Sequence, residues 1–86
     1  GSLSVKENML INFKIYPNPT ADKLIVENLD FSFDAEYVIV DLIGKEIMNG
    51  KLDKDTSIIN VSSLSKGVYI LSIKGEVSRV FKFVKN

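Results

Sequence analysis

The 86-residue chain is long enough for one domain and contains no Cys, His or Trp. The missing Cys and His exclude disulfides, thiolate nucleophiles, and the commonest zinc ligand and general base. Eleven basic residues balance eleven acidic ones, and nucleic-acid binding normally needs a basic excess, so no nucleic-acid partner is expected. The apolar residues include nine Val and ten Ile but only two Ala, and this β-branched excess favours strands over helices.

The N-terminal residues set the expected domain boundaries. Gly1 and Ser2 match the short remnant that tag removal leaves on a recombinant protein. Residues 3–12 are expected to be a linker and the start of the first strand, and residues 13–86 the domain itself. No apolar run approaches the roughly 20 residues of a membrane-spanning helix, so no transmembrane segment is expected.

Seven short runs rich in β-branched and aromatic residues, separated by Pro, Gly and charged turns, predict seven strands. These strands are expected at residues 9–16, 23–28, 37–42, 46–51, 57–61, 68–74 and 77–85. Pro17 and Pro19 end the first strand because proline cannot donate a hydrogen bond to a sheet. The run 37–42 is apolar at almost every position, which is typical of a central strand covered on much of both faces. A single sheet could not hide both of those faces, so the pattern predicts an all-β, antiparallel β-sandwich with no significant helix.

Alternation within the strands and the turn signals predict where particular side chains lie. In the loop 29–36, Phe31 and Phe33 are expected to plug the core, and Gly44 is expected to adopt a positive φ in a hairpin bulge. Leu64 is expected to pin the compact loop 62–67. The residues expected to face the core are Ile59, Val61, Tyr69, Leu71, Ile73, Phe81 and Phe83, with the Tyr69 hydroxyl at the edge of the sandwich.

Three polar clusters could carry chemistry, and each also has a structural explanation. Asp53-Lys54-Asp55 could form part of a calcium loop, but such loops need more acidic ligands, so a solvated turn is favoured. Asp41 could act as an acid or base, but its place before Gly44 is typical of a carboxylate that accepts backbone N–H bonds. Ser65 and Lys66 could form a nucleophile pair, but neighbours in an extended segment point apart. The residues therefore indicate no catalytic site, no metal site and no cofactor.

The last strand is locally basic, and this has two explanations. Arg79, Lys82 and Lys85 could be charges that discourage aggregation through an edge strand. Alternatively, a partner could read this strand. Both lysine head groups are expected in solvent because burial of an unpaired lysine is costly.

Four motifs follow one another in an order that is more specific than any one of them. They read Tyr16-Pro17-Asn18-Pro19, Asp41-Leu42-Ile43-Gly44-Lys45, Leu64-Ser65-Lys66-Gly67-Val68-Tyr69 and Lys82-Phe83-Val84-Lys85. From about Phe13 onward, the chain resembles the type A C-terminal sorting domain of the type IX (Por) secretion system of Bacteroidota. Asn60 stands where many members have Asp, and Val61 stands where Leu is common.

The resemblance implies an immunoglobulin-like sandwich at the C-terminus of a secreted cargo protein. It implies passage through the periplasm, recognition by the outer-membrane translocon, and removal by a sortase-like cysteine protease before the cargo reaches the cell surface or the medium. The positions that match the family's turns and fold are Pro17, Asn18, Pro19, Asp41, Gly44, Lys45, Gly67 and Tyr69. The terminal positions that match its recognition segment are Lys82, Phe83, Val84 and Lys85.

A second function remains open at the level of sequence. The chain could be a non-catalytic module of immunoglobulin or fibronectin type that binds carbohydrate or protein beside an extracellular enzyme. Such a module should display exposed aromatic side chains or a ligand loop. Here there is no Trp, and most of the aromatic residues stand at core spacing, which favours the sorting domain.

Overall fold

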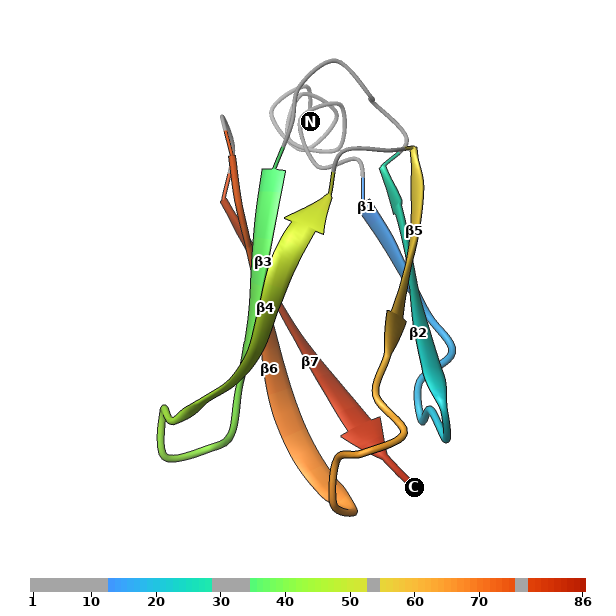
Figure 1. Cartoon of the computed structure of the whole chain (residues 1–86), viewed down its shortest axis with the longest axis vertical. Coiled ribbons are helices and arrows are strands. Elements are labelled where there is room, and N and C mark those ends of the chain that lie inside the picture. Colours follow the sequence, from blue (N-terminus) through green and yellow to red (C-terminus); the bar gives the residue numbers. More distant parts are fainter. Residues whose placement is uncertain (1–12, 29–34, 53–54, 76–77) are drawn as a thin grey trace, which may run out of the picture.

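The computed structural model describes residues 13–28, 35–52, 55–75 and 78–86, and it forms two antiparallel sheets packed face to face (Figure 1). The three-stranded sheet has the order β1-β2-β5, and the four-stranded sheet has the order β4-β3-β6-β7. The strands are β1 (Phe13–Tyr16), β2 (Lys23–Asn28), β3 (Ala35–Val40), β4 (Glu46–Leu52), β5 (Thr56–Asn60), β6 (Gly67–Lys74) and β7 (Arg79–Lys85). This confirms the predicted all-β sandwich of seven strands. Within the described ranges, no helix is long and apolar enough to cross a membrane.

The strand boundaries differ from the sequence prediction at β3. This strand begins at Ala35 rather than at residue 37, and it ends at Val40 rather than at residue 42. The prediction was therefore wrong for Leu42, which lies in the turn after β3 and is 67% exposed. The reason is local. The Asp41 carboxylate accepts hydrogen bonds from the backbone N–H groups of Ile43 and Lys45, so the turn begins directly after Val40. The expected plugs Phe31 and Phe33 lie outside the described residues.

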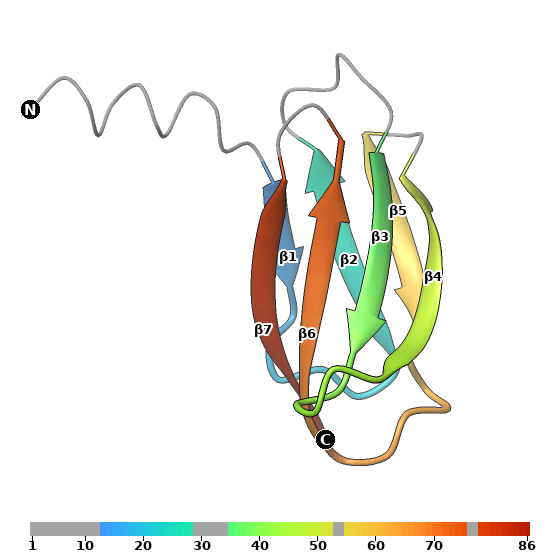
Figure 2. The same ribbon diagram turned by 90° about the vertical axis from the view of Figure 1, so that its left-hand side faces the viewer.

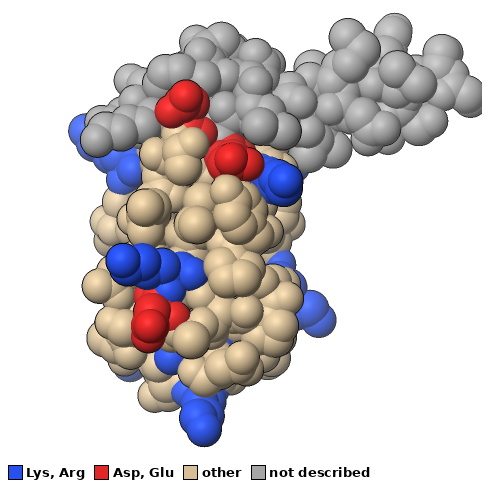
Figure 3. Space-filling model, turned by 90° about the vertical axis from the view of Figure 1, so that its right-hand side faces the viewer, with Lys and Arg blue, Asp and Glu red and all other residues tan. Residues whose placement is uncertain are grey.

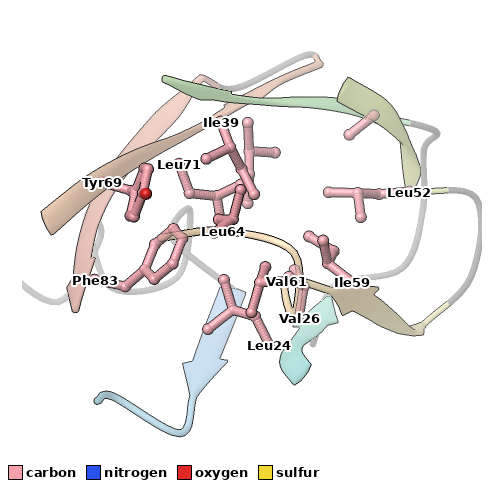
Figure 4. Packing of buried hydrophobic residues seen from close by; sticks show 12 residues of the cluster. Leu24, Val26, Ile39, Leu52, Ile59, Val61, Leu64, Tyr69, Leu71 and Phe83 are labelled. Carbon is pink, nitrogen blue, oxygen red and sulfur yellow. The ribbon is translucent and has the colours of Figure 1, made fainter. Parts of the chain in front are cut away.

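The core lies between the two sheets and confirms the predicted alternation (Figure 4). Its buried hydrophobic residues are Leu24, Val26, Ala35, Ile39, Leu52, Ile59, Val61, Leu64, Tyr69, Leu71, Ile73 and Phe83. Full burial of one such side chain contributes about 1.5–3 kcal/mol, so this cluster is the main source of stability in a chain without disulfides. Phe83 is fully buried and stacks on Tyr69, with ring centroids 5.7 Å apart.

The ends of the described chain lie at opposite poles of the sandwich. Figure 1 places the start of β1 at the upper pole and the C-terminus at the lower pole, near the segment between β5 and β6. Polypeptide that precedes Phe13 is therefore joined to the domain at the pole farthest from β7's last residues.

A glycine in β4 makes room for an aromatic ring from β3. Gly50 is directly opposite Tyr37, and a Cβ atom at residue 50 would lie 2.6 Å from the Tyr37 ring. The ring thus covers the backbone of the neighbouring strand, where a side chain would otherwise stand. Burial in this position raises the pKa of the Tyr37 phenol.

We expect Gly50→Ala to lower the free energy of unfolding by about 1–3 kcal/mol, because the new methyl group forces the Tyr37 ring out of place. In a Tyr37→Leu background the same substitution should cost much less, since the colliding ring is gone. Urea unfolding of the four proteins measures the interaction between the two sites. Equal costs in both backgrounds would contradict this account.

Candidate functional site

The loop between β1 and β2 lies along the open edge of β7, the last strand of the four-stranded sheet. The Asn18 side chain accepts a hydrogen bond from Val84 N at 2.9 Å and donates one to Lys82 O at 3.1 Å. A carboxamide carries a donor and an acceptor side by side, as a peptide group does. Asn18 therefore occupies the place that a neighbouring strand would take beside these two residues of β7.

Thr20 continues this pairing with its backbone. Its N–H donates to Val84 O and its C=O accepts from Asn86 N, both at 2.8 Å, so Thr20 and Lys85 form a parallel bridge. The Thr20 side chain is fully buried, and its hydroxyl donates to Lys23 O at the start of β2. We call Asn18 and Thr20 together the clasp, because they join the three-stranded sheet to the terminal strand of the other sheet.

Sequence reasoning selected Asn18 but missed Thr20. Its one signal in the sequence was its position directly after Pro19. A threonine there can adopt an extended backbone, and its hydroxyl can form a hydrogen bond with a nearby backbone group. The partners of the clasp lie more than 60 residues away in the chain, so no local pattern could reveal them. Both peptide bonds before the two prolines of this loop are cis.

The four terminal motif residues divide between the two faces of β7. Lys82 and Val84 point away from the core and are exposed, whereas Phe83 and Lys85 point inward and are buried. The expectation that both lysine head groups reach solvent is therefore wrong for Lys85, which is 8% exposed. Its ammonium group donates to the Asn86 main-chain oxygen at 2.9 Å, so the buried charge is hydrogen-bonded.

The β3–β4 hairpin confirms the structural explanation of Asp41. Asp41 Oδ1 accepts from Ile43 N at 3.1 Å and from Lys45 N at 2.9 Å, while Gly44 N donates to Asp41 O. Gly44 has a φ of +89°, as predicted, and open space surrounds the position of a Cβ atom. Asp41, Gly44 and Lys45 thus form one closed turn, and the carboxylate is used to hold it.

The loop before β6 is also held by local hydrogen bonds. The Tyr69 hydroxyl donates to Ser65 O at 2.8 Å, which confirms a core tyrosine with its polar end at the edge of the sandwich. Asn60 Oδ1 accepts from both the backbone N–H and the hydroxyl of Ser62, so this side chain binds within its own loop. The loop ends at Gly67, where β6 begins. These serines are used in the turn.

One further sequence candidate, the calcium loop at residues 53–55, gains no support as a metal site. Asp53 and Lys54, part of the weighed calcium loop, lie outside the described residues. Among the residues that are described, no three His, Cys, Asp or Glu side chains gather where they could hold a metal ion.

These features define a class of protein: an immunoglobulin-like β-sandwich whose motif residues serve its turns and its terminal strand. Residues 14–86 match the family described as the secretion system C-terminal sorting domain, and the chain belongs to this family. The match confirms the resemblance drawn from the order of the motifs.

The comparison with solved structures shows the same fold. The chain is similar to part of PorZ of Porphyromonas gingivalis, which is described as an essential bacterial surface component of the type IX secretion system. The TM-score is 0.73 at 18% sequence identity, over 90% of this chain and 12% of the PorZ chain. This chain thus corresponds to about an eighth of that protein. No curated protein sequence matches the chain significantly.

We expect Asn18→Ala to lower the free energy of unfolding by about 1–2 kcal/mol, because two hydrogen bonds to β7 are lost. The Val84 amide proton should also exchange faster with solvent. Asn49→Ala is the matched control, since that amide donates only to Glu46 in its own strand. Unchanged exchange at Val84 in the Asn18 variant would show that the clasp does not protect the strand.

We expect Gly44→Val to cost about 1–2 kcal/mol or more, because a β-branched residue is strained at a positive φ. Gly44→Asn should cost less, since Asn tolerates this conformation, and no neighbouring atom obstructs either side chain. Thermal unfolding of both variants measures the difference. An equal melting temperature for Val and Asn would rule out backbone strain as the cause.

Proposed function

We propose that this domain is the C-terminal signal of a secreted protein and directs its cargo through the type IX secretion system. The cargo precedes Phe13, passes through the periplasm, and reaches the cell surface or the medium after crossing the outer membrane. The observation that carries this proposal is the family match over residues 14–86, which includes the described sandwich except its first residue, Phe13. In this function the domain is transported and read by other proteins, so it needs no catalytic residues of its own.

The geometry of the two poles supports this role. Cargo would be joined at Phe13, at the upper pole, whereas the terminal residues of β7 lie at the lower pole (Figure 1). The translocon can therefore approach the end of β7 while the cargo is still attached. We assign its recognition to Lys82 and Val84, because these two residues of the terminal motif reach solvent.

Phe83 and Lys85 take an indirect part in this recognition. Phe83 is fully buried against Tyr69, and Lys85 is buried beside the clasp. Their side chains are not available to a partner of the folded domain. We infer that they position β7, so that Lys82 and Val84 are held on the outside.

We further propose that a sortase-like cysteine protease of the outer membrane removes the domain by cleaving before β1. A protease binds its substrate as an extended segment, and the residues from Phe13 onward are paired within a sheet. Cleavage within residues 3–12 would leave the sandwich intact and release the cargo. The thiolate that attacks the peptide bond belongs to the protease, since this chain has no Cys.

Residues 3–86 fused to a periplasmic reporter should send it to the surface or medium of cells with an intact type IX system. In a strain without the translocon the reporter should stay in the periplasm. Cell fractionation followed by a reporter assay gives the two amounts. Equal export in both strains would refute the sorting function.

Within the same assay, Lys82→Ala should reduce export while the melting temperature of the purified chain stays nearly unchanged, because an exposed charge contributes little to stability. Lys51→Ala is a suitable control, since it removes an exposed lysine from the opposite edge strand of the same sheet. Normal export of the Lys82 variant would contradict the recognition role and favour the other explanation, in which this charge prevents aggregation through the edge strand.

A further inference from the structure

The outer face of the four-stranded sheet carries β-branched side chains in register across three strands. Strand pairing places Val40, Ile70 and Lys82 in one row across β3, β6 and β7. The next row contains Val38, Ser72 and Val80, and Val68 lies opposite Val84. We call Val38, Val40, Ile70, Val80, Lys82 and Val84 the valine face.

The valine face is apolar and lies on the outside of the sandwich. Val80 is 67% exposed and Val84 is 37% exposed, while the face's residues on the central strands are partly buried. Figure 2 shows β7, β6, β3 and β4 side by side, with no other described strand in front of them. Contiguous exposed apolar surface of this kind marks an interaction site more often than scattered single residues do.

The opposite face of the sandwich is built differently. Acidic and basic side chains lie there side by side (Figure 3). On its strands the Lys14 ammonium lies 5.5 Å from the Tyr16 ring centre. Burial raises the pKa of the Tyr16 phenol. A hydrogen bond to Glu27 and the negative charge of that residue raise it further. The outer face of the three-stranded sheet is therefore mixed, since Lys14 and Glu27 stand in the row next to that of Tyr16, Ile25 and Ile58. The valine face carries a single charge by comparison.

Core packing does not explain the valine face, because its side chains point away from the other sheet. Protection against aggregation does not explain its lysine fully either. The clasp already occupies the backbone edge of β7 at Lys82 O and at both polar groups of Val84. A neighbouring molecule could not add a strand along this part of the edge, with or without the lysine charge.

On strands β3, β6 and β7, Lys82 is the only charged residue in its own row and in the two neighbouring rows. Its row continues into β4 at Glu46, which lies beyond Ile70 and Val40. A partner that covered these rows would remove water from the ammonium group. The cost would be several kcal/mol unless the partner supplied a negative charge. The face therefore fits an apolar surface with one carboxylate and penalises an apolar surface without it.

We propose that the valine face is the docking surface for a component of the export machinery that presents apolar side chains around one carboxylate, which pairs with Lys82. This inference rests on the proposed sorting function and extends its recognition surface from the terminal strand to β6 and β3. It locates part of the signal in Val38 and Val40, which lie 48 and 46 positions before Asn86 in the sequence.

The test uses outward-facing residues far from the terminal motif. Val38→Thr combined with Val40→Thr keeps side-chain shape and adds two hydroxyl groups to the face. Ile25→Thr combined with Ile58→Thr makes a similar change on the outer face of the other sheet, where these residues are paired. Export of the fused reporter should fall by at least about tenfold in the first variant, the equivalent of about 1.4 kcal/mol of binding, and stay near wild type in the second. Lys82→Glu should also abolish export, since it would face the partner's carboxylate.

Each outcome bears on a different statement. Normal export of the Val38/Val40 variant, with an unchanged melting temperature, would overturn the docking face even if Lys82→Ala still impaired export. In that case the terminal strand alone would be the signal. Export of the wild-type fusion without a translocon would overturn the sorting function itself.

A second copy of this chain is the competing occupant of the valine face. Sedimentation of the purified chain as a dimer that the Val38/Val40 substitutions dissociate would show that copy to be the partner, and would overturn the proposal.

Discussion

The hydrogen bonds between the clasp and β7 are the interaction on which the rest of the structure depends. In a sandwich, the two sheets are held mainly by the non-directional contacts of their inner faces. The clasp adds directional bonds that join the β1–β2 loop to the terminal strand of the other sheet. Pairing with β6 sets Phe83 inward and Lys82 outward, and the clasp holds the same residues of β7 from the opposite edge.

The clasp also connects the first and last of the four sequence motifs of this chain. Asn18 supplies a side-chain amide where β7 lacks a neighbouring strand, and the backbone of Thr20 supplies the next pair of bonds. Pro17 and Pro19 have no backbone N–H groups, so the loop needs no hydrogen-bond acceptors at these two positions. The first motif is therefore best understood as part of the edge of the terminal strand.

The strands, the core and the local turns could be predicted from sequence because their causes are local. Alternation placed Leu71 and Ile73 inward, and Asp41 and Gly44 define their turn within five residues. The clasp could not be predicted, since its two halves meet only after both sheets have formed. The burial of Lys85 was missed for the same reason: Thr20, which forms a parallel bridge with Lys85, comes from the other end of the domain.

The position of Phe83 has a consequence for the order in which the domain is made. This fully buried ring, its partner strand and the bonds from Thr20 to residues 84–86 all require the last residues of β7. Because these contacts join distant parts of the chain, they form late and slowly compared with local turns. The sandwich cannot close until β7 has been synthesised to its end. Until then β6 lacks its neighbour on one edge, and Tyr69 lacks the ring against which it stacks.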